Sequence, residues 1–247
     1  MERKAKAITT QLKGRFHPAG DRCLIVEFGQ KIAPDINRAV RSLAAYLLQH
    51  PLAGVTDVVP AFATVAIHYR PEAIEGLRAG ASPHNLLCEQ VQAILIQGLA
   101  PQQGDARWVE IPVCYEGEFA PDLAEVATLC KLTHEQVIER HGASPHFVYM
   151  LGFAPGFAYI GGLDKRLAVP RRMTPRTRIP AGSVAIADEL SAIYPLQTPG
   201  GWNVIGRTPL KLFDSTASPP CLLLPGDEVH FVAISMQEFQ RMSAMQS

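Results

Sequence analysis

Apolar residues recur at helical spacing in two segments of the N-terminal half. Residues 34–50 and 83–99 each place an apolar stripe on one face, built from Ile36, Val40, Leu43, Ala44 and Leu47 in the first and from Leu87, Val91, Ile94 and Leu95 in the second. Residues 22–28, 55–60 and 64–69 are β-rich runs. The resulting β-α-β-β-α order predicts a ferredoxin-like α+β domain over residues 21–100.

The pattern changes in the C-terminal half. Residues 107–115 alternate as a strand, and two short helices follow, the second opened by a capping box of Thr133 and Gln136 and closed by Gly142. From residue 146 onward, prolines and glycines interrupt short apolar runs, as a barrel or sandwich requires. We expect an all-β domain over residues 107–235, a polar linker at 101–106 and a tail at 236–247.

Charge and cysteine usage narrow the functional classes. The chain has 23 basic and 23 acidic residues, but residues 1–20 hold five basic and one acidic, so the rest carries a net charge of −4. We expect residues 1–20 to be a disordered basic tail. An acidic body argues against nucleic-acid binding, and no apolar run is long enough to span a membrane. Five widely spaced cysteines without a Cys-x-x-Cys pair favour reduced thiols and a cytoplasmic location.

The common catalytic motifs are absent from the sequence. It contains no phosphate loop, dinucleotide-binding loop or nucleophile elbow. His134 and Glu135 begin a zinc-helix motif, but Ile138 stands where its second histidine belongs, so we expect no metal site. His141 precedes Gly142, where a cationic imidazole would complement a helix dipole, and we favour that capping role over catalysis.

Three segments could line a binding groove. Glycines and aromatic rings alternate at 152–157, so Gly152, Phe153, Gly156 and Phe157 form either a groove wall or a tight turn with core aromatics. Residues 165–178 contain six basic and no acidic residues, which indicates either an anion site or a solvated loop. In the third, residues 179–183, 194–202 and 206–208 place turn residues next to Tyr194, Trp202 and Arg207, which indicates either ligand contacts or β-turn architecture. The complete set of groove candidates is Gly152, Phe153, Gly156, Phe157, Arg176, Arg178, Ser183, Tyr194, Trp202 and Arg207.

These segments strongly resemble the family that contains the B subunit of 5-oxoprolinase, the sporulation kinase inhibitor KipI and the first-subunit domain of allophanate hydrolase-like proteins. The similarity covers about residues 18–234. Its matching stretches are residues 109–115, 149–157, 167–171, 175–176, 180–184, 193–195, 199–202, 206–208 and 225–227. One stretch departs from the family, because residues 188–192 replace a common Gly-x-Gln-Thr-Gly and Ala185 replaces a frequent glycine. The changed segment either alters which ligand the protein binds or only packs differently.

The resemblance implies that residues 107–235 form a cyclophilin-like β-barrel. It also implies a non-autonomous component of a complex that opens 5-oxo-L-proline to glutamate, with ATP as cosubstrate and no covalently bound cofactor. The implied partners are a homologous cyclophilin-like protein, similar to the C subunit of 5-oxoprolinase, and a protein similar to its A subunit. The alternative is a KipI-like regulator that binds a sensor histidine kinase. A prolyl isomerase is a third option, resting on the barrel alone.

Two expectations follow for the site. The sequence offers no catalytic nucleophile, so we expect the isolated chain to be inactive. We further expect Arg176 and Arg207 to face the barrel groove near Gly156 and Phe157, where paired guanidiniums would bind a carboxylate or phosphate.

Overall fold

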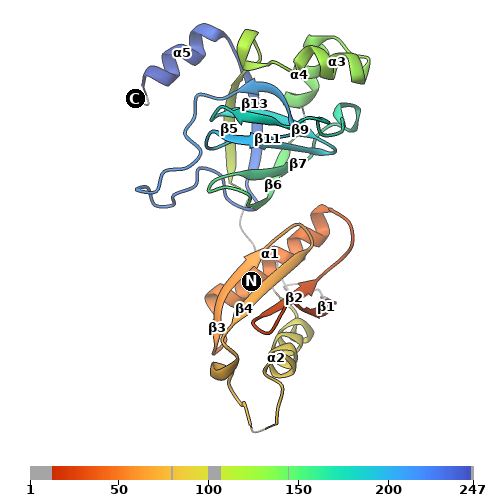
Figure 1. Cartoon of the computed structure of the whole chain (residues 1–247), viewed down its shortest axis with the longest axis vertical. Coiled ribbons are helices and arrows are strands. Elements are labelled where there is room, and N and C mark those ends of the chain that lie inside the picture. Colours follow the sequence, from red (N-terminus) through yellow and green to blue (C-terminus); the bar gives the residue numbers. More distant parts are fainter. Residues whose placement is uncertain (1–12, 79, 100–106, 144, 246–247) are drawn as a thin grey trace, which may run out of the picture. The chain divides into compact units, whose positions relative to one another are not determined.

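The chain divides into two units, Met1–Asp105 and Ala106–Ser247. A computed structural model describes residues 13–78, 80–99, 107–143 and 145–245 (Figure 1). The predicted linker at 101–106 lies outside the described residues, as do residues 1–12 of the predicted tail. In the part of the chain described, no helix has both the length and the hydrophobicity that crossing a bilayer requires.

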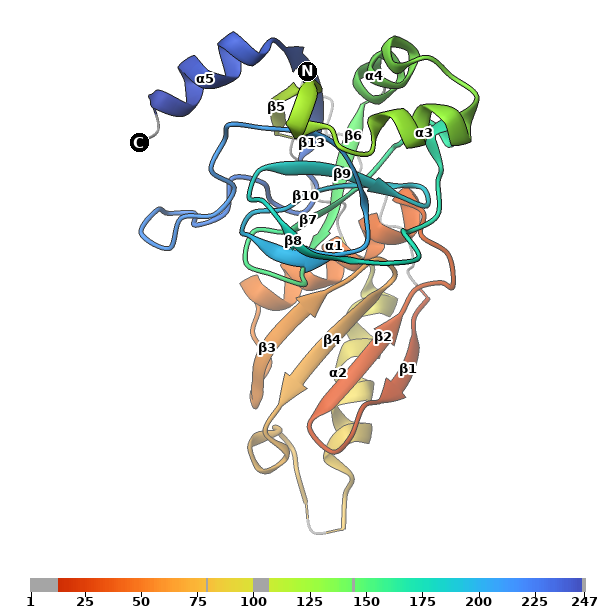
Figure 2. The same cartoon turned by 45° about the horizontal axis from the view of Figure 1, so that its top comes forward.

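The first unit is an antiparallel sheet with two α-helices. Its elements in chain order are β1 (Arg15–Pro18), β2 (Cys23–Glu27), α1 (Pro34–Gln49), β3 (Val55–Pro60), β4 (Thr64–Tyr69), the 3₁₀ helix η1 (Pro71–Ala73) and α2 (Pro83–Gln97). The sheet order is β1-β2-β4-β3, and both helices pack on one face (Figure 2). The predicted apolar stripes form the core, because Val40, Leu43 and Leu87 are fully buried against the sheet.

One prediction for this unit needs correction, and the ferredoxin-like order is not confirmed. Residues 15–18 are not a disordered tail, because β1 pairs with β2 and Phe16 packs against the core. A ferredoxin-like order would place its fourth strand after the second helix. Among the described residues of this unit the fourth strand is β1, which precedes β2 in the chain. The basic, proline-ended segment lacks a long apolar run, so its edge-strand role was not evident from the sequence.

The second unit is built around a closed barrel. Its elements are β5 (Trp108–Cys114), η2 (Gly117–Phe119), α3 (Leu123–Cys130), α4 (His134–Ala143), β6 (His146–Leu151), β7 (Ala158–Gly161), η3 (Lys165–Leu167), β8 (Arg176–Ile179), β9 (Ser183–Ala187), β10 (Leu190–Ile193), β11 (Thr198–Gly200), β12 (Asn203–Arg207), β13 (Glu228–Ile234) and α5 (Met236–Ala244). The strand order around the barrel, within the residues described, is β10-β7-β6-β13-β5-β12-β9. The fold is therefore mixed α/β with a seven-stranded barrel.

A small second layer covers part of the barrel wall. Within the residues described, strands β8 and β11 pair only with each other, outside the closed barrel. Strand β9 is buried on both faces: Val184 and Ile186 belong to the barrel core, whereas Ala185 and Ala187 pack in a second cluster with Phe157 and others. This double burial explains why β9 is a continuous apolar run rather than an alternating strand.

The helices of this unit confirm some expectations and correct others. The capping box at Thr133 and Gln136 is present, with both reciprocal hydrogen bonds formed. Helix α4 continues to Ala143, so Gly142 lies inside it and does not end it. The predicted tail at 236–247 contains α5, which begins with a capping box between Ser235 and Glu238. A polar cap can thus start a helix where the apolar content of the segment is low.

Candidate functional site

An aromatic pocket of about 290 Å³ lies where the β8–β11 layer meets the barrel. We call the aromatic pocket the space lined by Phe153, Phe157, Tyr159, Arg171, Pro175, Tyr194, Pro199, Gly200, Gly201 and Trp202. The ring of Phe157 is its centre and makes edge contacts with Phe153 and Tyr194, with centroids 5.2 Å apart in both pairs. Such edge-to-face packing fixes the rings, so the walls are formed before any ligand arrives.

Backbone geometry holds the rim of this pocket. Phe153 has a left-handed φ of 69°, and its side chain is 65% exposed. A non-glycine residue in that region is strained, and such strain is concentrated at functional sites. Gly156 has a φ of 79°, and a Cβ there would come within 2.8 Å of the Phe213 Cβ. The turn that carries Phe153 and Phe157 therefore requires glycine at position 156.

The floor of the aromatic pocket depends on a close approach between Tyr194 and Gly200. Tyr194 is almost fully buried, and burial raises the pKa of its phenol to about 12. Its hydroxyl lies where a Cβ on Gly200 would stand, so strand β11 can cross it only with glycine at that position. The phenol therefore stays protonated at neutral pH and acts as a neutral polar group in the floor.

One cation borders the aromatic pocket. The Arg171 guanidinium carbon lies 5.6 Å from the ring centroid of Trp202, within the range of a cation–π interaction. Arg171 is exposed and forms no ion pair with another described residue. The pocket can thus stack a flat molecule on its rings and pair one negative charge with Arg171.

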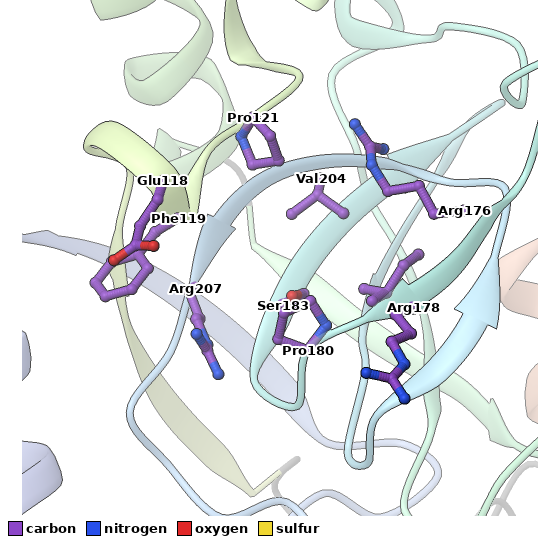
Figure 3. A pocket seen from close by; sticks show the side chains of 10 residues that line it. Glu118, Phe119, Pro121, Arg176, Arg178, Pro180, Ser183, Val204 and Arg207 are labelled. Atoms are coloured by element: carbon purple, nitrogen blue, oxygen red, sulfur yellow. The ribbon is translucent and has the colours of Figure 1, made fainter.

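A second, smaller pocket of about 130 Å³ lies beside β8 and β9 (Figure 3). We call the arginine pocket the space lined by Glu118, Phe119, Pro121, Arg176, Arg178, Ile179, Pro180, Ser183, Val204 and Arg207. Three guanidiniums and one carboxylate border it. The local charge is therefore positive before any ligand binds, although Arg176 is already paired with a carboxylate outside the lining.

That carboxylate belongs to Asp122, at the start of α3. Arg176 donates two parallel hydrogen bonds to it, of 2.7 and 2.6 Å, and Arg172 donates a third of 2.8 Å. The Val204 amide donates a fourth, of 2.7 Å. Asp122 is 1% exposed, so this is a buried carboxylate with its lone pairs satisfied. It fixes Arg176 relative to the barrel.

A tight turn fixes the other side of the arginine pocket. Gly182 has a φ of 80°, and a Cβ there would collide with the Thr208 carbonyl oxygen. The Thr208 amide donates to the Gly182 oxygen, and Arg207 Nε donates to the Ala181 oxygen, both at 2.9 Å. The Arg207 guanidinium also lies 5.5 Å from the Phe119 ring centroid. These contacts hold Arg207 beside the turn that begins β9.

The predicted single groove is thus two pockets. Phe153, Phe157, Tyr194 and Trp202 line the aromatic pocket, whereas Arg176, Arg178, Ser183 and Arg207 line the arginine pocket. The expectation that Arg176 and Arg207 face Phe157 was wrong, because they line the arginine pocket, where Arg176 pairs with Asp122 and Arg207 lies against Phe119. Gly152 and Gly156 line neither pocket and instead shape the turn that carries the rings.

Several lining residues were not among the ten groove candidates, and three of them carry a ring or a charge. Arg171 and Tyr159 belong to the basic run and the aromatic stretch that were singled out, but neither was included in the candidate set. Phe119 lies in a short 3₁₀ helix without a periodic pattern. The partner of Arg176, Asp122, is 54 residues away in sequence, so no local signal could identify it.

The segment that departs from the family lines neither pocket, but it packs against residues of the aromatic pocket. Strands β9 and β10 are joined by a two-residue turn at Asp188 and Glu189, with Asp188 at a φ of 51°. Ser191 is fully buried, and its hydroxyl lies 3.2 Å from His141 Nε2. Residues 188–192 form a hairpin that lines neither pocket, and Ala192 packs in one cluster with Phe157, Tyr194 and Trp202.

His141 itself corrects the predicted cationic cap. Its side chain is fully buried, with Nδ1 2.7 Å from the Tyr115 hydroxyl. Burial lowers its pKa well below the ordinary value, and the neighbouring His146 lowers it further. The imidazole is therefore neutral, and its two ring nitrogens are satisfied by hydroxyl groups. It forms part of the unit's internal hydrogen bonding and does not stabilise a helix dipole as a cation.

The described residues contain no group of three or more histidine, cysteine, aspartate or glutamate side chains able to hold a metal ion. All five cysteines have free thiols.

Comparison with known proteins places this geometry in a family. The family model described as "Carboxyltransferase domain, subdomain C and D" matches residues 14–223. The chain is 44% identical to the B subunit of 5-oxoprolinase from Bacillus subtilis (strain 168), over 89% of this chain and 92% of that protein. It is 35% identical to the B subunit of 5-oxoprolinase from Escherichia coli O157:H7, over 89% of this chain and 96% of that protein.

A solved structure gives the same result. The crystal structure of TTHA0988 is 36% identical, with a TM-score of 0.73, and the match covers 87% of this chain but 40% of that longer one. A family model spanning most of the residues and two relatives aligned over nearly their whole length establish the relationship. This chain belongs to the family of carboxyltransferase-domain subdomains C and D, alongside the proteins named as the B subunit of 5-oxoprolinase.

Proposed function

We propose that this chain is one component of an ATP-dependent 5-oxoprolinase complex, which opens 5-oxo-L-proline to L-glutamate. The observation that carries the proposal is its near full-length identity with two proteins named as the B subunit of 5-oxoprolinase. Relatives that similar share a fold and, in most cases, the role that the fold performs. We expect the complex to work in the cytoplasm, because the reaction consumes ATP.

The aromatic pocket supports this substrate class. 5-Oxoproline is a small ring with a flat amide and one carboxylate. Phe153, Tyr159 and Trp202 offer faces and edges for such a ring, and Arg171 offers a cation for its carboxylate. A pocket of about 290 Å³ is of the size that small-molecule sites have.

Lactam opening must overcome amide resonance. Transfer of the γ-phosphoryl group of ATP to the lactam oxygen would release ADP and make the ring carbon a better electrophile. Water would then add to that carbon and the carbon–nitrogen bond would break, which gives an acyl phosphate of glutamate. A second water molecule would hydrolyse this acyl phosphate to glutamate and inorganic phosphate. Each step conserves atoms and charge, and the guanidiniums would stabilise the negative charge that develops.

The chain is proposed to act with partners. The residues that line the aromatic pocket include no cysteine, serine, histidine or carboxylate, so the base that activates water would come from another protein of the complex. We infer two partners: a second cyclophilin-like protein, similar to the C subunit of 5-oxoprolinase, and a protein similar to its A subunit. In TTHA0988 the matching region is likewise part of a longer chain.

Reconstitution tests the proposal. The full chain would be co-expressed with the companion subunits of its own organism, and glutamate and ADP would be measured with 5-oxoproline as substrate. We expect equal amounts of both products, dependent on ATP and on every component. Turnover by the purified chain alone would contradict the division of labour. An assembled complex without turnover, together with micromolar binding to a histidine kinase, would favour the regulator instead.

A further inference from the structure

Two of the three guanidiniums of the arginine pocket lack a carboxylate partner. Arg178 is exposed on β8, and its guanidinium forms no hydrogen bond or ion pair with any described residue. Arg207 uses Nε on the Ala181 oxygen, and its two terminal nitrogens donate to no described residue. The one lining carboxylate, Glu118, forms no ion pair within the described ranges. Donors therefore remain available on both arginines.

A hydroxyl group lies between these cations. Ser183 begins β9, directly after the turn, and Figure 3 shows it with Pro180 between Arg178 and Arg207. The residue is 2% exposed, and its hydroxyl forms no hydrogen bond with another described residue. A nearly buried hydroxyl that borders a pocket and lacks an internal partner is available to an anion.

The arrangement is fixed before any ligand binds. The Asp122 carboxylate holds Arg176, and the Gly182 turn and the Phe119 ring hold Arg207. Binding would then order only Arg178, so little conformational entropy would be lost. A preorganised set of guanidinium and hydroxyl donors around a small volume fits an anion with several oxygens.

The space beyond this pocket suggests the rest of the ligand. The arginine pocket, at about 130 Å³, has room for phosphate groups but not for a nucleoside. An adjoining pocket of about 320 Å³ shares Phe119 and Arg207 with it and is bordered further by Thr208, Phe239 and Ser243. A ligand with a phosphate chain at one end and a larger polar group at the other fits both.

We propose that the arginine pocket binds the phosphate groups of the nucleotide cosubstrate, through Arg178, Arg207 and the Ser183 hydroxyl. This inference rests on the proposed function, because the nucleotide is the cosubstrate of that reaction. Two consecutive residues border the two pockets, Pro175 the aromatic pocket and Arg176 the arginine pocket.

Calorimetric titration of the assembled complex with ATP, inorganic tripolyphosphate and adenosine tests the proposal. ATP and tripolyphosphate should compete for one site, and adenosine alone should bind far more weakly. Arg178→Ala and Arg207→Gln should each weaken binding of ATP and tripolyphosphate by roughly 10- to 100-fold. Arg178→Lys should restore part of the loss, because it keeps the charge but not the bidentate geometry. Arg166→Ala, an exposed arginine outside both pockets, should bind as wild type.

Three outcomes would overturn the proposal: no binding of either probe to the wild-type complex, unchanged binding in both arginine variants, or loss of complex assembly with nucleotide affinity intact. The third would assign the arginines to an acidic partner surface. Tripolyphosphate binding that depends on Arg178 without any turnover of 5-oxoproline would refute the proposed reaction and leave the phosphate site standing. Turnover of 5-oxoproline with an ATP affinity that is unchanged in both arginine variants would support the proposed reaction and refute the phosphate site.

Discussion

Asp122 and Arg176 form a bidentate ion pair, with nitrogen–oxygen distances of 2.7 and 2.6 Å, between the start of α3 and the start of β8. The same carboxylate binds Arg172 and the Val204 amide. Three segments far apart in sequence therefore meet at one buried group. The pair holds the β8–β11 layer, and hence both pockets, against the barrel.

Replacing this carboxylate should destabilise the second unit. Asp122→Asn removes the negative charge. The asparagine keeps only one acceptor oxygen, so it cannot accept all the hydrogen bonds that Arg176 and the Val204 amide donate. We expect a loss of about 1–3 kcal/mol in the free energy of unfolding, below the value for a fully buried pair because the arginines are partly exposed. Urea unfolding followed by tryptophan fluorescence measures it, since both tryptophans, Trp108 and Trp202, lie in this unit.

The matched control is Glu125→Gln. Glu125 also pairs with Arg172, at 2.6 Å, but its side chain is 54% exposed. Exposed ion pairs contribute little, so we expect a change below about 0.5 kcal/mol. Equal effects of the two substitutions would show that burial of Asp122 does not govern the stability of this contact.

The sequence predicted the elements better than their connections. The apolar stripe at 34–50 became α1, which spans Pro34–Gln49, and the two runs after it became β3 and β4 without a change of boundary. Each of these signals lies within one segment, since periodicity is a local property. Strand β1 was missed because it is a short edge strand whose one core contact, Phe16, lies among basic residues.

The site was predicted in its composition but not in its geometry. All ten candidates lie in or beside the two pockets, yet Arg176 and Phe157 border different ones. Arg176 is held by Asp122, which is 54 residues away in the chain, and Trp202 packs in a cluster with Phe157, Ile179 and Tyr194. Neither tertiary contact leaves a periodic pattern in the sequence, so residue type alone could not separate the two pockets.

A methyl group at position 156 should disturb the aromatic pocket. Gly156→Ala combines a left-handed φ of 79° with contacts of 2.8 Å to Phe213 Cβ and 3.1 Å to the Leu212 oxygen. We expect a loss of about 2–4 kcal/mol in unfolding free energy, about 1 from the backbone and the rest from overpacking. Gly117→Ala has a φ of 53° but only one atom within 4 Å, at 3.9 Å, so it should lose only the backbone part. Equal losses would exclude steric crowding at Gly156.

Buried histidines should make the second unit sensitive to acid. Burial lowers the pKa of His141 and of His146. Below about pH 6.5 the unfolded state therefore binds more protons than the folded state. Stability is therefore full above that pH and falls as the pH decreases, by up to about 1.4 kcal/mol per pH unit for each histidine. Urea midpoints between about pH 6.5 and 5.0, above the main carboxylate titration, measure the slope.

The variant His141→Gln separates this effect from general acid sensitivity. The glutamine can still meet the Tyr115 and Ser191 hydroxyls but takes up no proton in either state. The slope of stability against pH should fall to about half its wild-type value, whatever the variant's stability at neutral pH. A slope equal to that of wild type would mean that His141 is not the group being titrated.

The carboxylate of the substrate provides the sharpest test of the aromatic pocket. Arg171 is its one lining cation, whereas the rings of Phe157 and Trp202 would contact any small lactam. Arg171→Ala should therefore weaken binding of 5-oxoproline to the assembled complex by roughly 10-fold or more. It should leave the weaker binding of 2-pyrrolidinone, the same ring without a carboxylate, within about twofold. Arg171→Lys should lie between the two, since it keeps the charge without the paired donors. Equal loss of both ligands would mean that Arg171 acts by supporting Trp202, and no loss of either would place the lactam elsewhere.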